Sequence, residues 1–188
     1  MDTDYYEDGD GWFVHKGHLT APTIVLVDLD STLADTRQRS HLTPREVPGT
    51  SWDDYSMHCA NDAPILGAIQ LVRLLASKHE IRIVTGRSER SLELTVNWLS
   101  AQRVPWDYLR LRKQTDPEDN VEYKRAVLDE LPQRSRVVLG IDDWPPVVQM
   151  WQENGIHALC VNPMYSADPN AYFAVVGTQQ ALESDSTS

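Results

Sequence analysis

The sequence predicts an α/β fold, a Rossmann-like three-layer sandwich with a central parallel sheet and a small flap inserted after the first strand. Apolar, β-branched runs alternate with helical patterns from residue 23 to residue 161, and this alternation is typical of a parallel sheet. The runs are apolar enough for strands that are buried on both faces. The connection over residues 31–63 is longer than an ordinary βα loop, so we expect the flap or small cap there.

The expected elements follow one another in a regular order. The first strand covers residues 23–28, and the first helix, 64–78, opens with Pro64 and carries Ile65, Ile69 and Val72 at core-facing spacing. The remaining elements are strand 80–85, helix 88–101, strand 106–111, helix 121–131, strand 136–141, helix 145–154 and strand 156–161.

The length of 188 residues is enough for one domain with a substantial core and short for two. We place the main domain at residues 21–165, with the flap at 31–63 inside it. An acidic segment, 1–20, precedes it and a segment, 166–188, follows it; the first ten and last six residues are expected to fray. The apolar residues 172–176 form either an extra strand or a docking segment.

Charge and composition restrict the function and the location. The net charge of −11 and the pI near 4.8 oppose a general nucleic-acid binder, which neutralises phosphates with Lys and Arg. The two cysteines, Cys59 and Cys160, indicate neither a disulfide framework nor a zinc site. We find no leader and no apolar run of membrane-spanning length, so we expect a soluble, cytoplasmic protein; the oligomeric state is left open.

Two aspartates follow the first predicted strand. Asp28 and Asp30 come after the run Ile24-Val25-Leu26-Val27, and side chains two residues apart on a strand share a face. Both carboxylates would then lie at the carboxyl ends of the strands, where open α/β sheets bind ligands. Two like charges this close require a cation, a shared proton or a function. The alternative is a solvated turn that closes the strand.

Further polar residues follow later strands or open a helix. Thr85-Gly86-Arg87 offers a hydroxyl, a free backbone N–H and a guanidinium to an oxyanion, or it simply forms a turn before the next helix. Asp142-Asp143 follows strand 136–141 and either reaches a cation or caps a helix. Lys124 opens helix 121–131 and would, by itself, be taken for a solvated lysine.

Taken in order, Asp28-x-Asp30-x-Thr32, Thr85, Lys124 and Asp142-Asp143 resemble the four motifs of the haloacid dehalogenase (HAD) superfamily of phosphotransferases, over about residues 23–161. The chain looks most like the 3′-phosphatase domain of phage-type polynucleotide kinase-phosphatases. The supporting residues are Arg39, Thr85-Gly86-Arg87, Arg112, Lys124 and Ile141-Asp142-Asp143. Ser31 stands where that family has glycine, and Asn120, next to Asp119, stands where it has an acidic residue.

The resemblance implies a HAD fold and a Mg²⁺-dependent phosphatase. Asp28 would attack phosphorus and form an aspartyl-phosphate, while Asp30 would protonate the leaving oxygen and later activate water. Mg²⁺ would be held by the carboxylates of Asp28 and Asp142 and the backbone carbonyl of Asp30, with Asp143 orienting a water or Lys124. Thr85 and Lys124 would hold the phosphoryl oxygens. The substrate-binding candidates are Thr32, Arg39, Gly86, Arg87 and Arg112.

The expected activity is removal of 3′-phosphate from polynucleotide ends, with a phosphorylated nucleic-acid end as the partner. The acidic net charge favours the alternative, a nucleotidase or small-metabolite phosphatase of the same superfamily. A third possibility is a non-catalytic binding module that keeps a metal site for structure. The sequence contains no Gly-x-x-x-x-Gly-Lys-[Ser/Thr] phosphate loop, so nothing in it indicates an attached kinase.

Overall fold

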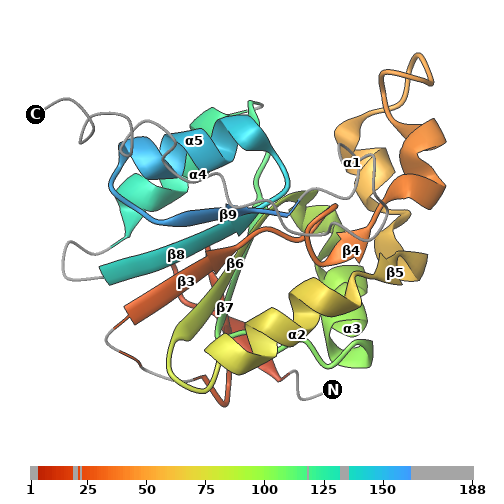
Figure 1. Cartoon of the computed structure of the whole chain (residues 1–188). Helices are drawn as coiled ribbons and strands as arrows, with labels where there is room; N and C mark the ends of the chain where they lie inside the picture. Colours follow the sequence, from red (N-terminus) through yellow and green to blue (C-terminus); the bar gives the residue numbers. More distant parts are fainter. Residues whose placement is uncertain (1–3, 19–20, 22, 118, 132–135, 162–188) are drawn as a thin grey trace, which may run out of the picture.

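A central sheet of seven strands runs through the molecule (Figure 1). The structure, a computed structural model, describes residues 4–18, 21, 23–117, 119–131 and 136–161. The strand order is β1-β2-β7-β6-β3-β8-β9, and the last five in this order are parallel, as predicted. The strands are β1 (Tyr5–Glu7), β2 (Phe13–His15), β3 (Thr23–Val27), β6 (Glu80–Ser88), β7 (Tyr108–Arg112), β8 (Arg136–Asp142) and β9 (Ala158–Cys160).

Helices cover both faces of this sheet and produce the predicted three layers (Figure 1). Ile69 of α2 belongs to the same buried cluster as Val25, whereas Val127 of α4 and Trp151 of α5 share a second cluster with Leu26. Val25 and Leu26 are neighbours on β3 and point to opposite faces of the sheet. This strand therefore contributes side chains to the hydrophobic core on each face. The helices are α2 (Leu66–Leu75), α3 (Leu92–Ala101), α4 (Asn120–Glu130) and α5 (Pro145–Glu153).

The central strand β3 brings the predicted motifs to one edge of the sheet. Val27 is level with Ile83 of β6 and with Ile141 of β8. Asp28 and Asp142 are the next residues after Val27 and Ile141, so they lie side by side at the carboxyl ends of these two strands. Thr85 lies two residues beyond Ile83, near the end of β6. Because the carboxyl ends of parallel strands meet at one edge, residues far apart in the sequence are adjacent there.

Two helices begin later than the sequence predicts. Pro64 does not open the first helix; it pairs with Ala34 in a short strand, and the helix α2 begins at Leu66. The strand β6 continues as far as Ser88, so the helix predicted from residue 88 begins at Leu92, after a 3-10 turn. In both places strand pairing, of β4 with β5 and of β6 with β7, includes residues whose local pattern favours a helix.

Fraying was predicted for the first ten residues, but residues 5–7 form a strand. β1 and β2 form an antiparallel hairpin, and β2 pairs with β7 at the edge of the sheet. The guanidinium of Arg110 donates to the backbone oxygen of Gly11 at 3.0 Å, and Gly11 has a φ of +85° that favours glycine. The apolar side chains of Trp12 and Val14 are buried, which explains why an acidic segment is ordered.

The insertion after β3 forms a small cap, as predicted, beside the sheet edge (Figure 1). Its two ends pair with each other as β4 (Ala34–Asp35) and β5 (Ala63–Pro64). Between them lie α1 (Trp52–Ser56) and two 3-10 turns, η1 (Arg37–Leu42) and η2 (Cys59–Asn61). We use the word cap for residues 31–63 from here on.

Within the described part of the chain, none of the helices has the length and apolar character needed to cross a lipid bilayer. Residues 166–188, including the apolar run 172–176 predicted as a strand or docking segment, lie outside the described residues.

Candidate active site

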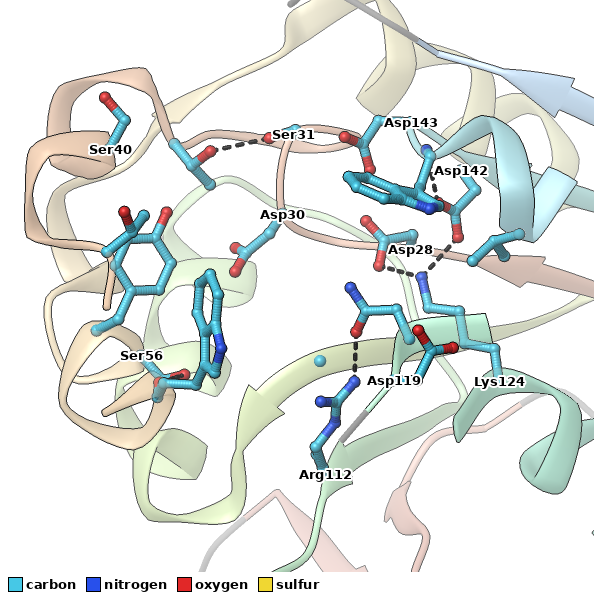
Figure 2. A pocket seen from close by; sticks show the side chains of 18 of the residues that line it. Asp28, Asp30, Ser31, Ser40, Ser56, Arg112, Asp119, Lys124, Asp142 and Asp143 are labelled. Carbon is cyan, nitrogen blue, oxygen red and sulfur yellow. Dashed lines mark hydrogen bonds and ion pairs between the residues drawn. The ribbon is translucent and has the colours of Figure 1, made fainter. Parts of the chain in front are cut away.

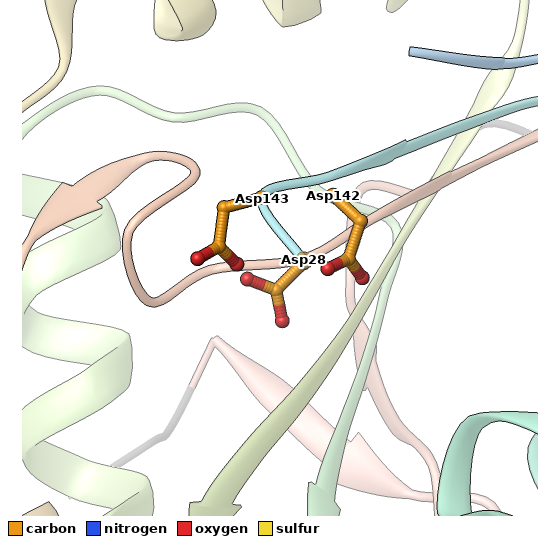
Figure 3. A group of neighbouring side chains, drawn as sticks. All are labelled: Asp28, Asp142 and Asp143. Atoms are coloured by element: carbon orange, nitrogen blue, oxygen red, sulfur yellow. The ribbon is translucent and has the colours of Figure 1, made fainter. Parts of the chain in front are cut away.

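Three carboxylates converge at the carboxyl edge of the sheet (Figure 3). Asp28 follows β3, Asp142 is the last residue of β8, and Asp143 comes next. One carboxylate oxygen from each lies within 4.8 Å of those of the other two. All three donors are oxygens, which suits a hard divalent cation such as Mg²⁺ better than a softer metal.

Lys124 reaches this cluster from the second turn of α4. Its ammonium Nζ donates to Asp28 Oδ1 at 2.6 Å and to Asp142 Oδ2 at 2.5 Å (Figure 2). Its side chain is only 4% exposed, so it is not the solvated lysine that its local sequence suggests. Burial opposes the charge on Lys124, but the Asp142 and Asp28 carboxylates outweigh burial and raise its pKa. Lys124 is therefore a permanent cation in the site.

One lysine does not neutralise the cluster. Burial raises the pKa of Asp28 to about 7; Lys124 opposes this rise and the neighbouring Asp142 adds to it. The pKa of Asp143 is raised well above its ordinary value by burial, and then by repulsion from Asp28 and Asp142. A further positive charge among these carboxylates would favour their ionised forms.

Asp30 faces away from this cluster and toward the cap. Its Oδ1 accepts from Arg39 Nη2 and from Arg87 Nε, both at 2.8 Å. Burial by itself would raise the pKa of Asp30, but Arg87 and Arg39 outweigh burial and lower it. In Figure 2 the Asp30 carboxylate lies between Asp28 and the cap residues Ser40 and Ser56. The two predicted catalytic acids thus occupy opposite electrostatic environments.

Asp62, at the end of the cap, completes a group of two arginines and two aspartates, of which Asp30 is partly exposed. Asp62 accepts from Arg39 Nε at 2.8 Å and from Arg87 Nη2 at 3.0 Å. Arg39 and Arg87 are 3% and 1% exposed. The structure therefore directs both guanidinium groups, predicted as substrate contacts, onto carboxylates, where they hold Asp30 in place.

The other predicted residues lie around the same edge. Thr85 is buried, and its hydroxyl accepts from the backbone N–H of Arg87 at 3.2 Å. Thr32 is also buried, and its hydroxyl has no partner within the described residues. Gly86 lines the pocket, where an added Cβ would lie 3.1 Å from Asn120 Oδ1. Arg112 lines it too and donates to the same Asn120 oxygen (Figure 2).

A pocket of about 370 Å³ lies between the sheet edge and the cap. Asp28, Lys124 and Asp142 line one side of it, and the cap contributes Arg45 and Trp52. The mixture of carboxylates and cations suits an anion that binds together with a cation. The site can thus accommodate an anion such as a phosphate group next to the Asp28 carboxylate.

The comparison of the sequence with known families agrees with this geometry. Residues 22–164 match the family described as the polynucleotide kinase PNKP phosphatase domain, a HAD family. The chain belongs to this family. As a HAD-type phosphatase, it is an enzyme, which favours catalysis over the non-catalytic binding module. No curated protein matches the sequence significantly.

Solved structures share the fold of this HAD-type phosphatase. Two structures of a Pnkp1/Rnl/Hen1 complex match with a TM-score of 0.61 each, at 23% and 22% identity over 76% and 77% of this chain. The chain spans about half the length of these relatives, 47% and 45%. YfnB from Bacillus subtilis, bound to magnesium, matches with a TM-score of 0.52 at 15% identity, over 80% of this chain and 93% of that one.

Two features of the site are absent from the sequence prediction. Asp62 was not singled out because it lies in an irregular insertion, where no periodicity shows which side chains point inward. Trp52 lies in the same insertion and lines the pocket. The only signal for either is their position in a long connection at the carboxyl edge of a parallel sheet, where such loops often carry function.

Proposed function

We propose that the protein is a Mg²⁺-dependent phosphomonoesterase that forms an aspartyl-phosphate on Asp28 and removes 3′-phosphate from polynucleotide ends. The observation that carries this proposal is the position of Asp28. Its carboxylate lies in the pocket with Lys124 at 2.6 Å and the Asp142 and Asp143 carboxylates within 4.8 Å. A nucleophilic carboxylate needs such neighbours to approach a phosphate dianion.

The residues at the sheet edge fit a magnesium ion. The carboxylates of Asp28, Asp142 and Asp143 and the backbone carbonyl of Asp30 would hold it. Their excess of negative charge over the single Lys124 ammonium supports this assignment. When bound, Mg²⁺ supplies charge neutralisation for the phosphate oxygens and for the attacking carboxylate. The magnesium in the YfnB structure is consistent with such a site in this fold.

Residues of the chain itself would carry out the attack on phosphorus and hold the phosphoryl group. Asp28 Oδ attacks phosphorus, the ester oxygen leaves, and water later cleaves the aspartyl-phosphate. Lys124 holds a phosphoryl oxygen and keeps Asp28 oriented through their hydrogen bond. Gly86, which lines the pocket, would offer its backbone N–H to another phosphoryl oxygen, and the neighbouring Thr85 hydroxyl would support it from the end of β6. Together they act by position and charge, which is the main requirement of phosphoryl transfer.

Asp30 would serve as the acid and base. Arg39 and Arg87 lower its pKa, so it is ionised before substrate binds and suited to take a proton from water. A bound phosphate brings negative charge close to Asp30 and would raise its pKa toward the protonated form that the leaving oxygen needs. Arg39 and Arg87 are positioning residues in this scheme because they contact Asp30.

Two observations support a polynucleotide end as the substrate. The chain matches a polynucleotide kinase phosphatase domain family, and its fold neighbours include a protein in a complex described as an RNA repair complex. The cap contributes short helices and turns instead of a separate domain, so it leaves space for a polymer. The net charge of −11 favours the second candidate, a nucleotidase or small-metabolite phosphatase.

A substrate panel with an inactive variant tests this proposal. We expect the protein with Mg²⁺ to release phosphate from a 3′-phosphorylated oligonucleotide faster than from a 5′-phosphorylated one, a mononucleotide or a sugar phosphate. Asp28→Asn should lower kcat by roughly 10³-fold or more on every substrate, since it removes the nucleophile. Asp129→Asn, an exposed carboxylate on α4, is the matched control and should keep full activity.

Each part of the proposal has its own contrary result. A clear preference for mononucleotides would replace the polynucleotide substrate with the nucleotidase alternative. Full activity in a folded Asp28→Asn protein would refute the covalent mechanism. Unchanged turnover after EDTA treatment would refute the magnesium requirement.

A further inference from the structure

Trp52 is an exposed aromatic residue in the wall of the active-site pocket. Its side chain is 49% exposed, and it lines the same pocket as Asp28 and Lys124. Trp144 lines the pocket from the α5 side, but it is only partly exposed because it packs against a buried apolar cluster. Trp52 is therefore the large aromatic surface that a bound molecule can cover.

The indole of Trp52 has a ring face available. Tyr55 is its aromatic neighbour, with ring centroids 5.5 Å apart and ring planes at 88°. An edge-to-face partner covers at most one face of the indole, and a planar ligand can stack on the other. The Tyr55 ring is itself covered on one side by the Arg39 guanidinium at 4.2 Å, so it is the less available ring.

Local hydrogen bonds hold Trp52 in place. Ser51 caps α1, with its hydroxyl accepting from the backbone N–H of Asp54 at 3.1 Å. The hydroxyl of Ser56 donates to the backbone oxygen of Trp52 at 2.8 Å and accepts from the N–H of Ser88 at 3.2 Å. These bonds tie Trp52 to the end of β6, which also carries Thr85 and Gly86.

A second connection joins α1 to the acid/base residue. Arg39 donates to the backbone oxygen of Tyr55 at 3.4 Å and also to Asp30 at 2.8 Å. The backbone of Trp52 is thus held at a set position relative to Asp30, and the edge-to-face contact with Tyr55 packs against its ring. An aromatic side chain has only two rotatable bonds, so it loses little conformational entropy when a ligand stacks on it.

We propose that Trp52 is a stacking platform for the nucleobase of the nucleotide that carries the scissile phosphate. Arg45 and Arg112, which line the same pocket, would lie beside the chain of the substrate. Aromatic stacking next to cationic side chains is the usual way proteins bind single-stranded nucleic acid without reading its sequence. This inference rests on the proposed function, because it concerns the substrate of the same site.

A substrate that lacks the terminal base tests the proposal. One oligonucleotide ends in a 3′-phosphorylated adenosine, and its partner ends in a 3′-phosphorylated abasic sugar. We expect the wild-type kcat/KM to be roughly tenfold higher for the base-bearing end, mainly through KM. Trp52→Leu, which keeps apolar bulk without a flat ring, should abolish this difference, whereas Trp52→Phe should keep most of it.

A matched control separates stacking from the structural role of the cap. Met57→Ala removes another exposed apolar side chain, 38% exposed, that follows α1 and does not line the pocket. It should leave the preference unchanged. The proposal is overturned if Trp52→Leu lowers kcat/KM equally for both ends, or if the wild type treats both ends alike.

Failure of the proposed function gives a different result. If the wild type hydrolyses neither oligonucleotide but hydrolyses nucleotides in an Asp28-dependent way, the polynucleotide substrate is wrong. The platform is then tested by a nucleoside 3′-monophosphate against ribose phosphate. A preference for the nucleoside that is lost in Trp52→Leu supports the platform, and equal rates overturn it.

Discussion

Ser31 has a backbone conformation that most L-residues avoid. Its φ is +63°, in the left-handed region. The phage-type polynucleotide kinase-phosphatases that the sequence resembles have glycine at this position. A Cβ in this region costs roughly 1–2 kcal/mol. The Ser31 hydroxyl lies 2.8 Å from that of Thr36, and such a hydrogen bond offsets part of the cost. Ser31 thus occupies the turn that follows Asp30, and its hydroxyl ties this turn to Thr36 in the cap.

We therefore expect Ser31→Gly to be more stable than Ser31→Ala by about 1 kcal/mol. Both variants lose the hydroxyl, so their difference isolates the backbone conformation. At an ordinary position the order is reversed, because alanine is favoured over glycine by roughly 0.5–1 kcal/mol. Urea unfolding followed by circular dichroism measures the difference. A more stable alanine variant would show that residue 31 is not strained.

At the scale of residues, the sequence predicts the parts of the site that follow regular elements. Asp28, Lys124 and Asp142 could be placed because each comes at a strand end or a helix start, where the topology brings them together. Arg39 and Arg87 were recognised as important, but their partner Asp62 was not. The burial of an ion pair depends on the path of an irregular segment, and no short-range pattern records that path.

At the scale of elements, the contact of α5 with β8 depends on a glycine. A Cβ built on Gly140 would lie 2.1 Å from Cε3 of Trp151 and 2.6 Å from its Cζ3. Trp151 is 1% exposed and cannot turn aside into solvent. The missing side chain at residue 140 therefore allows the indole to lie flat on the strand that ends in Asp142.

Gly140→Ala should lower the free energy of unfolding by about 1–3 kcal/mol, as overpacking of a core typically does. Trp151→Leu should also destabilise the protein, but combining the two substitutions should cost less than their sum because the smaller side chain removes the clash. Denaturant titrations of the two single variants and the double variant measure this coupling. Additive effects would mean that the two residues do not compete for space.

The N-terminal hairpin shows where element prediction is least effective. β1 and β2 have three residues each, too few for a period-two pattern to be recognised. The turn-forming Asp8-Gly9-Asp10-Gly11 followed by Trp12-Phe13-Val14 is a hairpin signal in retrospect. The longer βα elements were predicted within a few residues because their apolar runs are long and their burial is two-sided.

At the scale of the whole molecule, the carboxylate cluster should make stability depend on the bound cation. Folding brings Asp28, Asp142 and Asp143 within 4.8 Å, whereas the unfolded chain keeps them apart. A cation that binds only the folded form stabilises it by mass action. We expect millimolar Mg²⁺ to raise Tm by a few degrees, measured by calorimetry, and EDTA to reverse the rise.

Asp142→Asn is the control for this prediction. It removes one charge from the cluster, so the variant should show little or no Mg²⁺-dependent rise in Tm. The monovalent ion Na⁺ at the same ionic strength should have no comparable effect on the wild type. An identical shift in the wild type and the variant would place the cation elsewhere on the molecule.

The pairing of β4 with β5 has a consequence for the evolution and engineering of this chain. Ala34 is level with Pro64, so the cap leaves and rejoins the domain at neighbouring points. The residues between them can be lengthened, shortened or exchanged with little effect on the path of the sheet, because loop length changes the closure entropy only slowly. Graft experiments can therefore vary the cap, provided that Arg39, which holds the Asp30 side chain, and its partner Asp62 are kept.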